Sequence, residues 1–248
     1  MGDAFWQIVV VGFAAQMVDG ALGMAYGLTS TSLLLTLGFT PAAASAAVHL
    51  AETATTGVSA TSHHLARNVD WKLVWPLAIS GALGGIAGAS LLATGLGDML
   101  APLVSGYLVL MGGVVLWKAF LAVPGIHPPR GVRRLGLAGG FVDAVGGGGW
   151  GPVVSSTLLA SGGSARHMIG SSNAAEFFVT AAITVTFAGH LGLSEFGMTA
   201  LALVLGGLPA APFAAIAVRY APRRPLMMIV GLLIIALGVR GVLRAFSG

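Results

Sequence analysis

Two stretches of this sequence share one pattern: VDGALGMAYG covers Val18 to Gly27, and VDAVGGGGWG covers Val142 to Gly151. Each begins with Val-Asp, continues with a glycine-rich segment, and lies within apolar sequence. The second stretch follows the first by 124 residues, which is half of the 248-residue chain. This spacing indicates a duplication in which each half carries one copy of the segment.

The composition excludes a water-soluble domain. Hydrophobic residues make up 56% of the chain, charged residues only 8%, and the mean hydropathy is +0.91, whereas soluble domains carry about 25% charged residues. The absence of Cys excludes disulfides, thiolate catalysis and Cys-based metal sites. The net charge of +4 reflects basic loops rather than a nucleic-acid surface. The composition therefore predicts an integral membrane protein whose surroundings are the lipid bilayer.

A bilayer span needs roughly 20 apolar residues, and the sequence offers about eight candidate elements on that criterion. We expect an all-α polytopic membrane protein built from them. The candidates are Ala4 to Leu37, Pro41 to Leu65, Trp71 to Thr94, Met99 to Leu121, Leu135 to Ser161, Ala165 to Leu191, Phe196 to Val218 and Leu226 to Phe246.

Laying each residue over the one 124 positions later, without a gap, supports the duplication. Identical polar residues and glycines in register are more informative than matching Leu or Ala, which apolar sequence supplies by chance. We predict a first membrane repeat over residues 1–124 and a second over 125–248, joined in one integrated domain. The identical pairs include Gly12/Gly136, Val18/Val142, Asp19/Asp143, Gly23/Gly147, Gly27/Gly151, Ser32/Ser156, Gly38/Gly162, Glu52/Glu176 and Thr56/Thr180.

The first element, Ala4 to Leu37, is too long for one span. It divides into two apolar pieces of about 14 residues around DGALGMAYG, each roughly 21 Å long and able to reach only the bilayer middle. Unwound backbone at that depth is tolerated where it faces protein or a wet cavity. Helices broken at matching positions of two halves point to the central site of a transporter.

Basic residues predict how the broken element is threaded. If it forms a re-entrant hairpin, ten of the twelve Lys and Arg residues lie on one side of the membrane, leaving Arg240 and Arg244 on the other. A crossing element gives a less clean division, so the positive-inside rule favours the hairpin. Each half then has one hairpin and three crossings, which makes the halves inverted copies. We predict periplasmic termini and cytoplasmic loops near Arg67, Arg130 and Arg223.

These segments also carry a resemblance to a known family. DGALGMAYGLTSTSLLLTLGFTPAAASAAVHLAETATTGVSATSHHLARNVDW (residues 19–71) and GGGGWGPVVSSTLLASGG (residues 146–163) resemble the two halves of the TauE/SafE-type sulfite exporter (TSUP) family. The resemblance implies a multi-pass transporter of the bacterial inner membrane that moves sulfite, thiosulfate or sulfonates. The first half has lost the consecutive glycines that are typical of the family.

The four consecutive glycines, Gly146, Gly147, Gly148 and Gly149, are the strongest candidate for anion binding. Successive N–H groups could form a concave nest, and the half-helix starting near Trp150 would point its positive end at the same place. Packing of helices is the alternative role for these glycines, and for Gly20, Gly23 and Gly27. In GALGGIAGAS (residues 81–90), the glycines are predicted to serve close helix packing only.

A polar stripe is predicted on the helix after the first hairpin, where Ser45, His49, Glu52, Thr56, Ser59 and His63 recur every three or four residues. The matching stripe in the second half is Asn173, Glu176, Thr180 and Thr184. Carboxyl groups inside a membrane are costly and are functional candidates by default. Desolvation favours their protonated form, so Glu52 and Glu176 could carry a coupling proton or serve as polar scaffold. His49 stands where the second half has Asn173, so the halves are expected to contribute unequally.

The remaining candidates surround the two glycine-rich interruptions of the helices, residues 19–27 and residues 143–151, which we call the first and the second break. Asp19 and Asp143 are expected to cap the turns, because Asp bonds readily to nearby backbone N–H groups; a coupling role is the alternative. Tyr26 and Trp150 are candidates for walls or gates of the site, with interior packing as the alternative. Hydroxyl donors are expected from Ser30 to Ser32 and from Ser155 to Thr157, with Ser32 and Ser156 as the matching pair, although bonding back to the helix is the commoner arrangement.

Three functions remain from the sequence. The first is a secondary transporter that exports a small sulfur-containing anion, sulfite before thiosulfate or sulfonate, by alternating access; it needs no cofactor, no metal and no ATP, and the GxxxxGK[ST] motif is absent. The second is a proton- or cation-coupled carrier of another small ion with the Asp, Glu and His residues as ligands. A remote third is an intramembrane hydrolase. The glycine-rich helix faces would also permit a homodimer.

Overall fold

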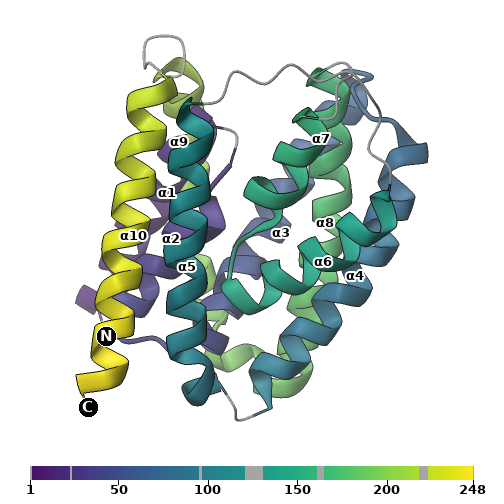
Figure 1. Ribbon diagram of the computed structural model, residues 1–248. Helices are drawn as coiled ribbons and strands as arrows, with labels where there is room; N and C mark the ends of the chain where they lie inside the picture. The colour runs from purple at the N-terminus through teal and green to yellow at the C-terminus, as the bar shows by residue number, and fades with distance from the viewer. Residues whose placement is uncertain are drawn as a thin grey trace.

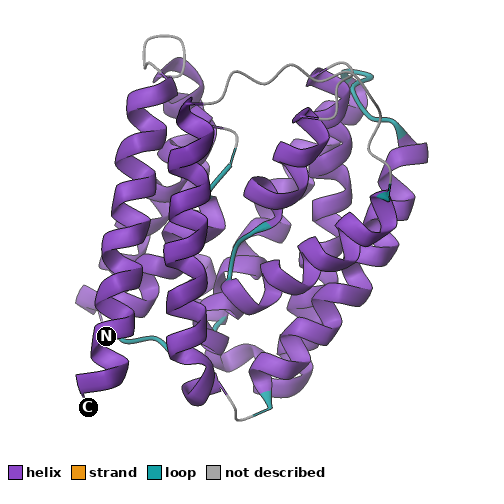
Figure 2. Ribbon diagram, in the orientation of Figure 1, coloured by secondary structure: helices purple, strands orange, loops and turns teal. Residues whose placement is uncertain are grey.

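The structure is a computed structural model that describes residues 2–22, 24–94, 97–120, 131–160, 165–217 and 223–247. Those residues are mostly helical and contain no β-strand (Figure 2), which confirms the all-α prediction. The elements are α1 Gly2–Leu22, α2 Tyr26–Thr36, α3 Pro41–Leu65, α4 Trp71–Ala93, α5 Gly97–Phe120, α6 Val132–Gly146, the π-helix η1 Gly151–Ser155, α7 Ser156–Ala160, α8 Ala165–Leu191, the 3₁₀ turn η2 Leu193–Glu195, α9 Gly197–Ala217 and α10 Arg223–Ser247.

The two halves have the same order of elements. The helices α1 to α5 correspond to α6, η1 with α7, α8, α9 and α10. Their packing is reciprocal: α1 packs on α9 as α4 packs on α6, while α3 packs on α8 and α5 on α10. A pseudo-twofold relation between the halves would generate these pairs. The duplication and its inversion across the membrane stay predictions, and the boundary at residues 124 and 125 lies outside the described residues.

The helices gather in two groups with α3 between them (Figure 1). In one group, α5 and α10 lie side by side, and α1, α2 and α9 pack with them. In the other, α4 lies against both α6 and α8. Because α3 contacts α2 and α9 on one side and α8 on the other, its side chains are placed where the two groups meet.

The outer surface is apolar, as a bilayer requires. Large apolar side chains are exposed on several helices, among them Trp6, Leu83, Val185 and Ile229, and contiguous apolar surface of this kind is costly in water. Among the described residues, two helices are long and apolar enough to cross a membrane by themselves, Trp71–Ala93 and His167–Leu191. Shorter apolar stretches lie in α1, α5, α9 and α10. The described helices therefore fit a polytopic membrane protein.

Glycines allow the closest helix crossings. A Cβ atom on Gly84 would overlap the carbonyl of Leu137, and one on Gly88 would lie 2.6 Å from the Phe141 carbonyl oxygen. These contacts join α4 to α6 backbone to backbone, the arrangement that small residues permit in membrane bundles. The packing role predicted for the glycines of residues 81–90 is confirmed.

The breaks differ in detail from the expected pieces of about 14 residues. The helix α1 continues through Asp19 to Leu22, and α2 has only 11 residues. Gly20 and Ala21 fit a helix, so α1 winds on until the chain turns. At the second break α6 runs toward the turn and α7 runs back from it (Figure 1).

Candidate functional site

The two breaks touch each other at the centre of the bundle. A Cβ atom on Gly27 would lie 2.6 Å from the Gly148 Cα atom, and Gly148 has a φ of 147°, which favours glycine. The contact is reciprocal, since a Cβ atom on Gly151 would lie 3.0 Å from the Met24 Cβ atom. The Thr31 hydroxyl donates to the Gly147 carbonyl oxygen at 2.5 Å. Backbone from both halves therefore meets directly at one point.

Each break is held by an aspartate from the preceding helix. The Tyr26 backbone N–H donates to Asp19 Oδ1 at 3.2 Å, and the Trp150 backbone N–H donates to Asp143 Oδ1 at 2.9 Å. Each carboxylate thus accepts from the first turn of the next helix, seven residues on, where the helix dipole is positive. This geometry agrees with the capping role expected for both aspartates.

The backbone N–H groups of the glycine segment donate to the protein itself, whereas an anion-binding nest needs them free to bind the anion. Gly146 is the last residue of α6, and the N–H groups of Gly147 and Gly148 donate to the Asp143 carbonyl oxygen. The Gly147 and Gly148 carbonyl oxygens accept from the Thr31 and Tyr107 hydroxyls. The segment is a tightly bonded turn, which differs from the predicted row of free amides.

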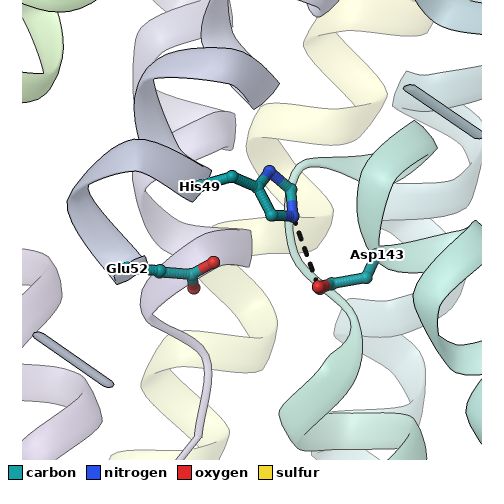
Figure 3. Close-up of side chains that lie close together, drawn as sticks. All are labelled: His49, Glu52 and Asp143. Atoms are coloured by element: carbon teal, nitrogen blue, oxygen red, sulfur yellow. Dashed lines mark hydrogen bonds and ion pairs between the residues drawn. The ribbon is translucent and has the colours of Figure 1, made fainter. Parts of the chain in front are cut away.

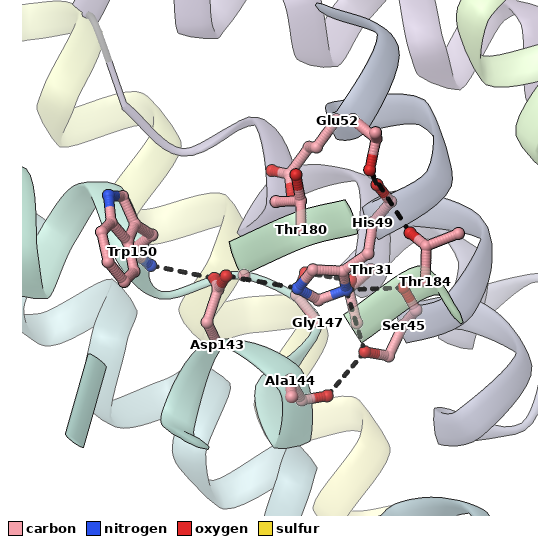
Figure 4. Close-up of polar contacts among 12 residues, drawn as sticks. Thr31, Ser45, His49, Glu52, Asp143, Ala144, Gly147, Trp150, Thr180 and Thr184 are labelled. Atoms are coloured by element: carbon pink, nitrogen blue, oxygen red, sulfur yellow. Dashed lines mark hydrogen bonds and ion pairs between the residues drawn. The ribbon is translucent and has the colours of Figure 1, made fainter. Parts of the chain in front are cut away.

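His49 lies in a buried polar network that joins the halves (Figure 4). Its side chain is fully buried, with Nδ1 2.7 Å from the Ser45 carbonyl oxygen and Nε2 3.3 Å from Asp143 Oδ2. The Ser45 hydroxyl donates to the Ala144 carbonyl oxygen at 2.6 Å. The network connects α3 of the first half to α6 of the second. His49 therefore orients Asp143 by contact.

Glu52 lies one helical turn beyond His49 on α3, and its carboxyl group lies close to His49 and Asp143 (Figure 3). It is 6% exposed, and its Oε2 atom is buried without a hydrogen-bond partner. A Cβ atom on Gly27 would lie 2.9 Å from Glu52 Oε1, so this carboxyl group also lies close to the first break. One ligand atom from each of His49, Glu52 and Asp143 lies within 4.8 Å of the other two.

The breaks and the polar faces of α3 and α8 enclose a cavity of about 270 Å³. It lies where the two breaks meet and holds most of the predicted site residues. The lining residues are Gln16, Asp19, Met24, Ala25, Tyr26, Gly27, Leu28, Glu52, Thr55, Thr56, Ser59, Asp143, Gly148, Gly149, Trp150, Gly151, Pro152, Ser155, Asn173 and Glu176.

The lining is polar and acidic. Four carboxyl side chains contribute to it, Asp19, Glu52, Asp143 and Glu176, while no Lys or Arg does among the described residues. The neutral donors include the Tyr26 and Ser59 hydroxyls and the Asn173 amide, of which the last donates to Ser59 Oγ at 2.8 Å. Whether the glutamates carry protons or serve as scaffold stays a prediction.

Several predicted site residues lie elsewhere. Gly146, Gly147 and His49 lie behind the cavity wall, and Gly23 is outside the described residues. Ser32 is buried with an unpartnered hydroxyl and borders a separate void near Arg240. The Ser156 hydroxyl donates back to the Pro152 carbonyl oxygen, while its neighbour Ser155 lines the cavity.

The sequence reasoning missed Gln16 and Tyr107, whereas Ser155 belongs to the predicted hydroxyl donors Ser155 to Thr157. Gln16 precedes Asp19 by three positions on α1, a helical spacing that could have revealed it. The change from Ser156 to Ser155 follows from the π-helix η1, whose wider turn shifts the face that each residue presents. Tyr107 of α5, which bonds the glycine turn, gave no signal because its partner is 41 residues away in sequence.

A helical membrane bundle with two broken helices around a small central polar cavity is the arrangement expected of a membrane transporter. Comparison with known proteins gives the family. The family model "Sulfite exporter TauE/SafE" matches residues 8–241, so this chain belongs to that family. The chain is 41% identical over 239 residues to "Probable membrane transporter protein YtnM" of Bacillus subtilis (strain 168), covering 93% of this chain and 80% of that protein. No solved structure matches.

The family membership confirms the resemblance drawn from the two glycine-rich segments. It also places this chain among membrane transporters rather than enzymes, which removes the hydrolase alternative. The protein is a membrane transporter with an all-helical fold.

Proposed function

We propose that this protein exports a small sulfur-containing anion, sulfite first and thiosulfate or a sulfonate next, by alternating access. The family name supplies the substrate class. The cavity between the breaks is the observation that supports a transport site, because it lies at the meeting point of the two halves. At about 270 Å³ it falls below the roughly 300–1,000 Å³ of sites for drug-sized ligands, which suits a small ion with a few waters.

Alternating access would proceed by movement between the two helix groups. The helix α3 contacts both groups and carries Glu52, Thr56 and Ser59 into the cavity. Rocking of one group on the other would expose this face first to one side of the membrane and then to the other. The anion would be held by neutral donors such as Tyr26, Ser59 and Asn173.

The test is flux in proteoliposomes. Purified protein is reconstituted, and efflux of radiolabelled sulfite is followed with and without a pH gradient, with protein-free liposomes as the blank. Glu176→Gln is compared with the wild type, since an amide keeps the size of the side chain and cannot carry a proton. We expect sulfite flux above the blank and loss of the gradient response in Glu176→Gln. Gradient-independent flux in both proteins would make Glu176 scaffold, and no sulfite flux by folded protein would refute sulfite as substrate.

The acidic lining favours one second candidate, a carrier of small cations. Four carboxyl side chains without a lining Lys or Arg attract cations and repel anions. The same liposomes loaded with radiolabelled sodium or a divalent metal distinguish the two. Cation flux without sulfite flux would establish this second candidate.

We further propose that the protein lies in a bacterial inner membrane, with both termini periplasmic and the α3–α4 turn cytoplasmic. The chain contains no Cys, so single cysteines can be labelled without background. Ala66→Cys and Ser194→Cys place thiols on two exposed turns, the first between α3 and α4 and the second between α8 and α9. A membrane-impermeant thiol reagent added to intact cells with a permeable outer membrane should label only the Ser194→Cys protein; the opposite result would invert the orientation. A homodimer would double the mass seen by light scattering of the purified protein.

A further inference from the structure

The buried group formed by His49, Glu52 and Asp143 contains acceptor atoms that a cation would satisfy. His49 Nδ1 lies 2.7 Å from the Ser45 carbonyl oxygen and 3.2 Å from the Ser45 hydroxyl, which is itself donating to Ala144. A carbonyl oxygen only accepts, so Nδ1 carries a hydrogen. In the neutral imidazole Nε2 then has a free lone pair, and this atom faces Asp143 Oδ2 at 3.3 Å.

Two acceptor atoms do not face each other in a buried site without a cation between them. A proton would satisfy Nε2 and Asp143 Oδ2, but it would leave the third member of the group unsatisfied. Glu52 is 6% exposed, and its Oε2 atom has no hydrogen-bond partner. A buried carboxylate oxygen in this condition is costly unless it is paired or coordinates a metal.

We propose that His49, Glu52 and Asp143 bind one divalent transition-metal ion, of the Zn²⁺ class, through one nitrogen and two carboxylate oxygens. The ligand atoms lie within 4.8 Å of one another. Zn–N and Zn–O bonds of roughly 2.0–2.2 Å in a tetrahedron separate ligand atoms by about 3.4 Å, close to the 3.3 Å between Nε2 and Asp143 Oδ2. Glu52, whose ligand atom lies within 4.8 Å of the other two, would supply the third ligand.

The surroundings fit a metal ligand set. The Nδ1–H bond to the Ser45 carbonyl fixes the imidazole tautomer and orientation, as the outer partner of a metal-bound histidine usually does. Asp143 is oriented in turn by the Trp150 N–H. Two carboxylates and a neutral imidazole balance the charge of a divalent ion. Imidazole favours a transition metal over Mg²⁺ and Ca²⁺, which take oxygen ligands.

The site would open to the cavity, because Glu52 and Asp143 both line it. Three protein ligands leave a fourth position on a tetrahedral ion. A metal ion there would neutralise two of the four carboxylates and present a positive centre to a small oxyanion. The proposed metal site is independent of which anion is transported, because it is inferred from the positions of His49, Glu52 and Asp143.

The second half provides an internal comparison. The positions 124 residues away hold Asn173, Glu176 and Asp19, so both carboxylates are present and the imidazole is replaced by an amide. Asn173 donates to Ser59 Oγ instead. The metal site is therefore expected in one half only, with one ion per chain.

Metal content measured on purified protein tests the site without any transport. Protein in detergent is stripped with a chelator, equilibrated with Zn²⁺ or Co²⁺, freed of excess metal and analysed by mass spectrometry for metal per chain; Co²⁺ is also read by visible absorption. We expect one equivalent in the wild type and an absorption band of four-coordinate Co²⁺. His49→Asn should weaken binding by more than about 100-fold, because loss of a group that only orients a ligand costs roughly 10- to 100-fold. His190→Asn, the same change at an exposed helix end, should bind as the wild type does.

Two results would overturn the proposal: wild-type protein that binds no divalent metal, or His49→Asn protein that binds as tightly as wild type. The first would assign the space between His49 and Asp143 to a proton. The wild-type measurement alone can refute the metal site, so the test remains valid even if a variant folds poorly. Metal binding without sulfite flux would leave this site standing and refute only the proposed substrate.

Discussion

The two breaks are built on one frame and differ in what surrounds them. In both, an aspartate accepts from the backbone N–H seven residues later, Tyr26 in one and Trp150 in the other. The second break turns through Gly147 and Gly148 at positive φ, whereas the first places Ala25 at a φ of 89°. A Cβ at positive φ is strained, so the glycines make the second break the less strained of the two and the one that a neighbouring backbone can approach.

The difference extends to the next layer of side chains. His49 reaches Asp143 behind the second break, while the corresponding Asn173 turns to Ser59. Tyr107 donates to the glycine turn, and the residue 124 positions later is Gly231. The capping that forms a break is common to both halves, and the chemistry around it is not. Function is therefore expected to reside mainly at the second break.

The largest effect is expected from closing the space at the point where the breaks meet. In Gly148→Ala the new Cβ would overlap the backbone of Gly27 and Leu28, at a φ that favours glycine. Overpacking costs about 1–3 kcal/mol and the strained backbone adds about 1–3 kcal/mol. We expect loss of folded protein, measured as yield and thermal unfolding in detergent. Gly113→Ala is the control, since nothing lies within 4 Å of its new Cβ; equal behaviour of the two variants would contradict the backbone contact.

Removing the two aspartates in turn should break the symmetry. Asp143→Ala removes the Trp150 cap and leaves His49 without its partner, and breaking a buried pair costs about 3–5 kcal/mol. Asp19→Ala removes only the Tyr26 cap, for which about 0.5–2 kcal/mol is typical. Thermal unfolding of both variants should place Asp143→Ala well below Asp19→Ala. Similar losses would mean that His49 adds nothing to the second break.

Asn173→His places an imidazole beside the first break, at the position that corresponds to His49. The variant would hold an imidazole beside Glu176 and Asp19, the set equivalent to the proposed metal site. We expect metal content to rise from one equivalent per chain to two, measured as for the wild type. A content that stays at one would show that the first break does not share the ligand geometry of the second.

A smaller loss of stability than in Gly148→Ala or Asp143→Ala is expected from removing the hydroxyl that joins the breaks. In Thr31→Val the Gly147 carbonyl loses its donor while the side-chain shape is kept, so we expect a loss of about 1–3 kcal/mol for a buried acceptor left unpaired. The control is Thr61→Val, whose exposed hydroxyl bonds only to its own helix at Gly57. Unfolding temperatures that fall equally would assign the loss to the helix rather than to the junction.

The sequence predicted the elements well because their cause is local. Pro41 and the Thr40 side chain start α3, as the Asp70 side chain starts α4, and the length of the apolar stretch then sets the length of each helix. The breaks were predicted from the glycine-rich segments that follow Asp19 and Asp143, where glycine favours a turn within a few residues. This prediction placed the end of α1 too early, because nothing local distinguishes Gly20 in a helix from Gly20 in a turn.

The candidate site was predicted less completely, for a physical reason. The polar stripe of α3 was expected to form one face, but Ser45 and His49 pack against α6 while Glu52 and Ser59 line the cavity. One stripe serves two neighbours because α3 lies between the two helix groups. The hydrogen bonds of Gly147 and Gly148 likewise come from Thr31 and Tyr107, which are remote in sequence.

Local sequence patterns establish an integral helical membrane protein, show approximately where its helices begin and break, and resemble the TauE/SafE family. These features can be predicted because hydropathy, glycine and capping residues act on backbone only a few positions away. The contacts between polar groups, in contrast, depend on how the helices pack in three dimensions. In the folded protein His49 of α3 contacts Asp143 of α6, and the glycine amides donate within their own turn. Four carboxyl side chains line one cavity. Those contacts depend on how the two halves pack, and no local pattern encodes that packing.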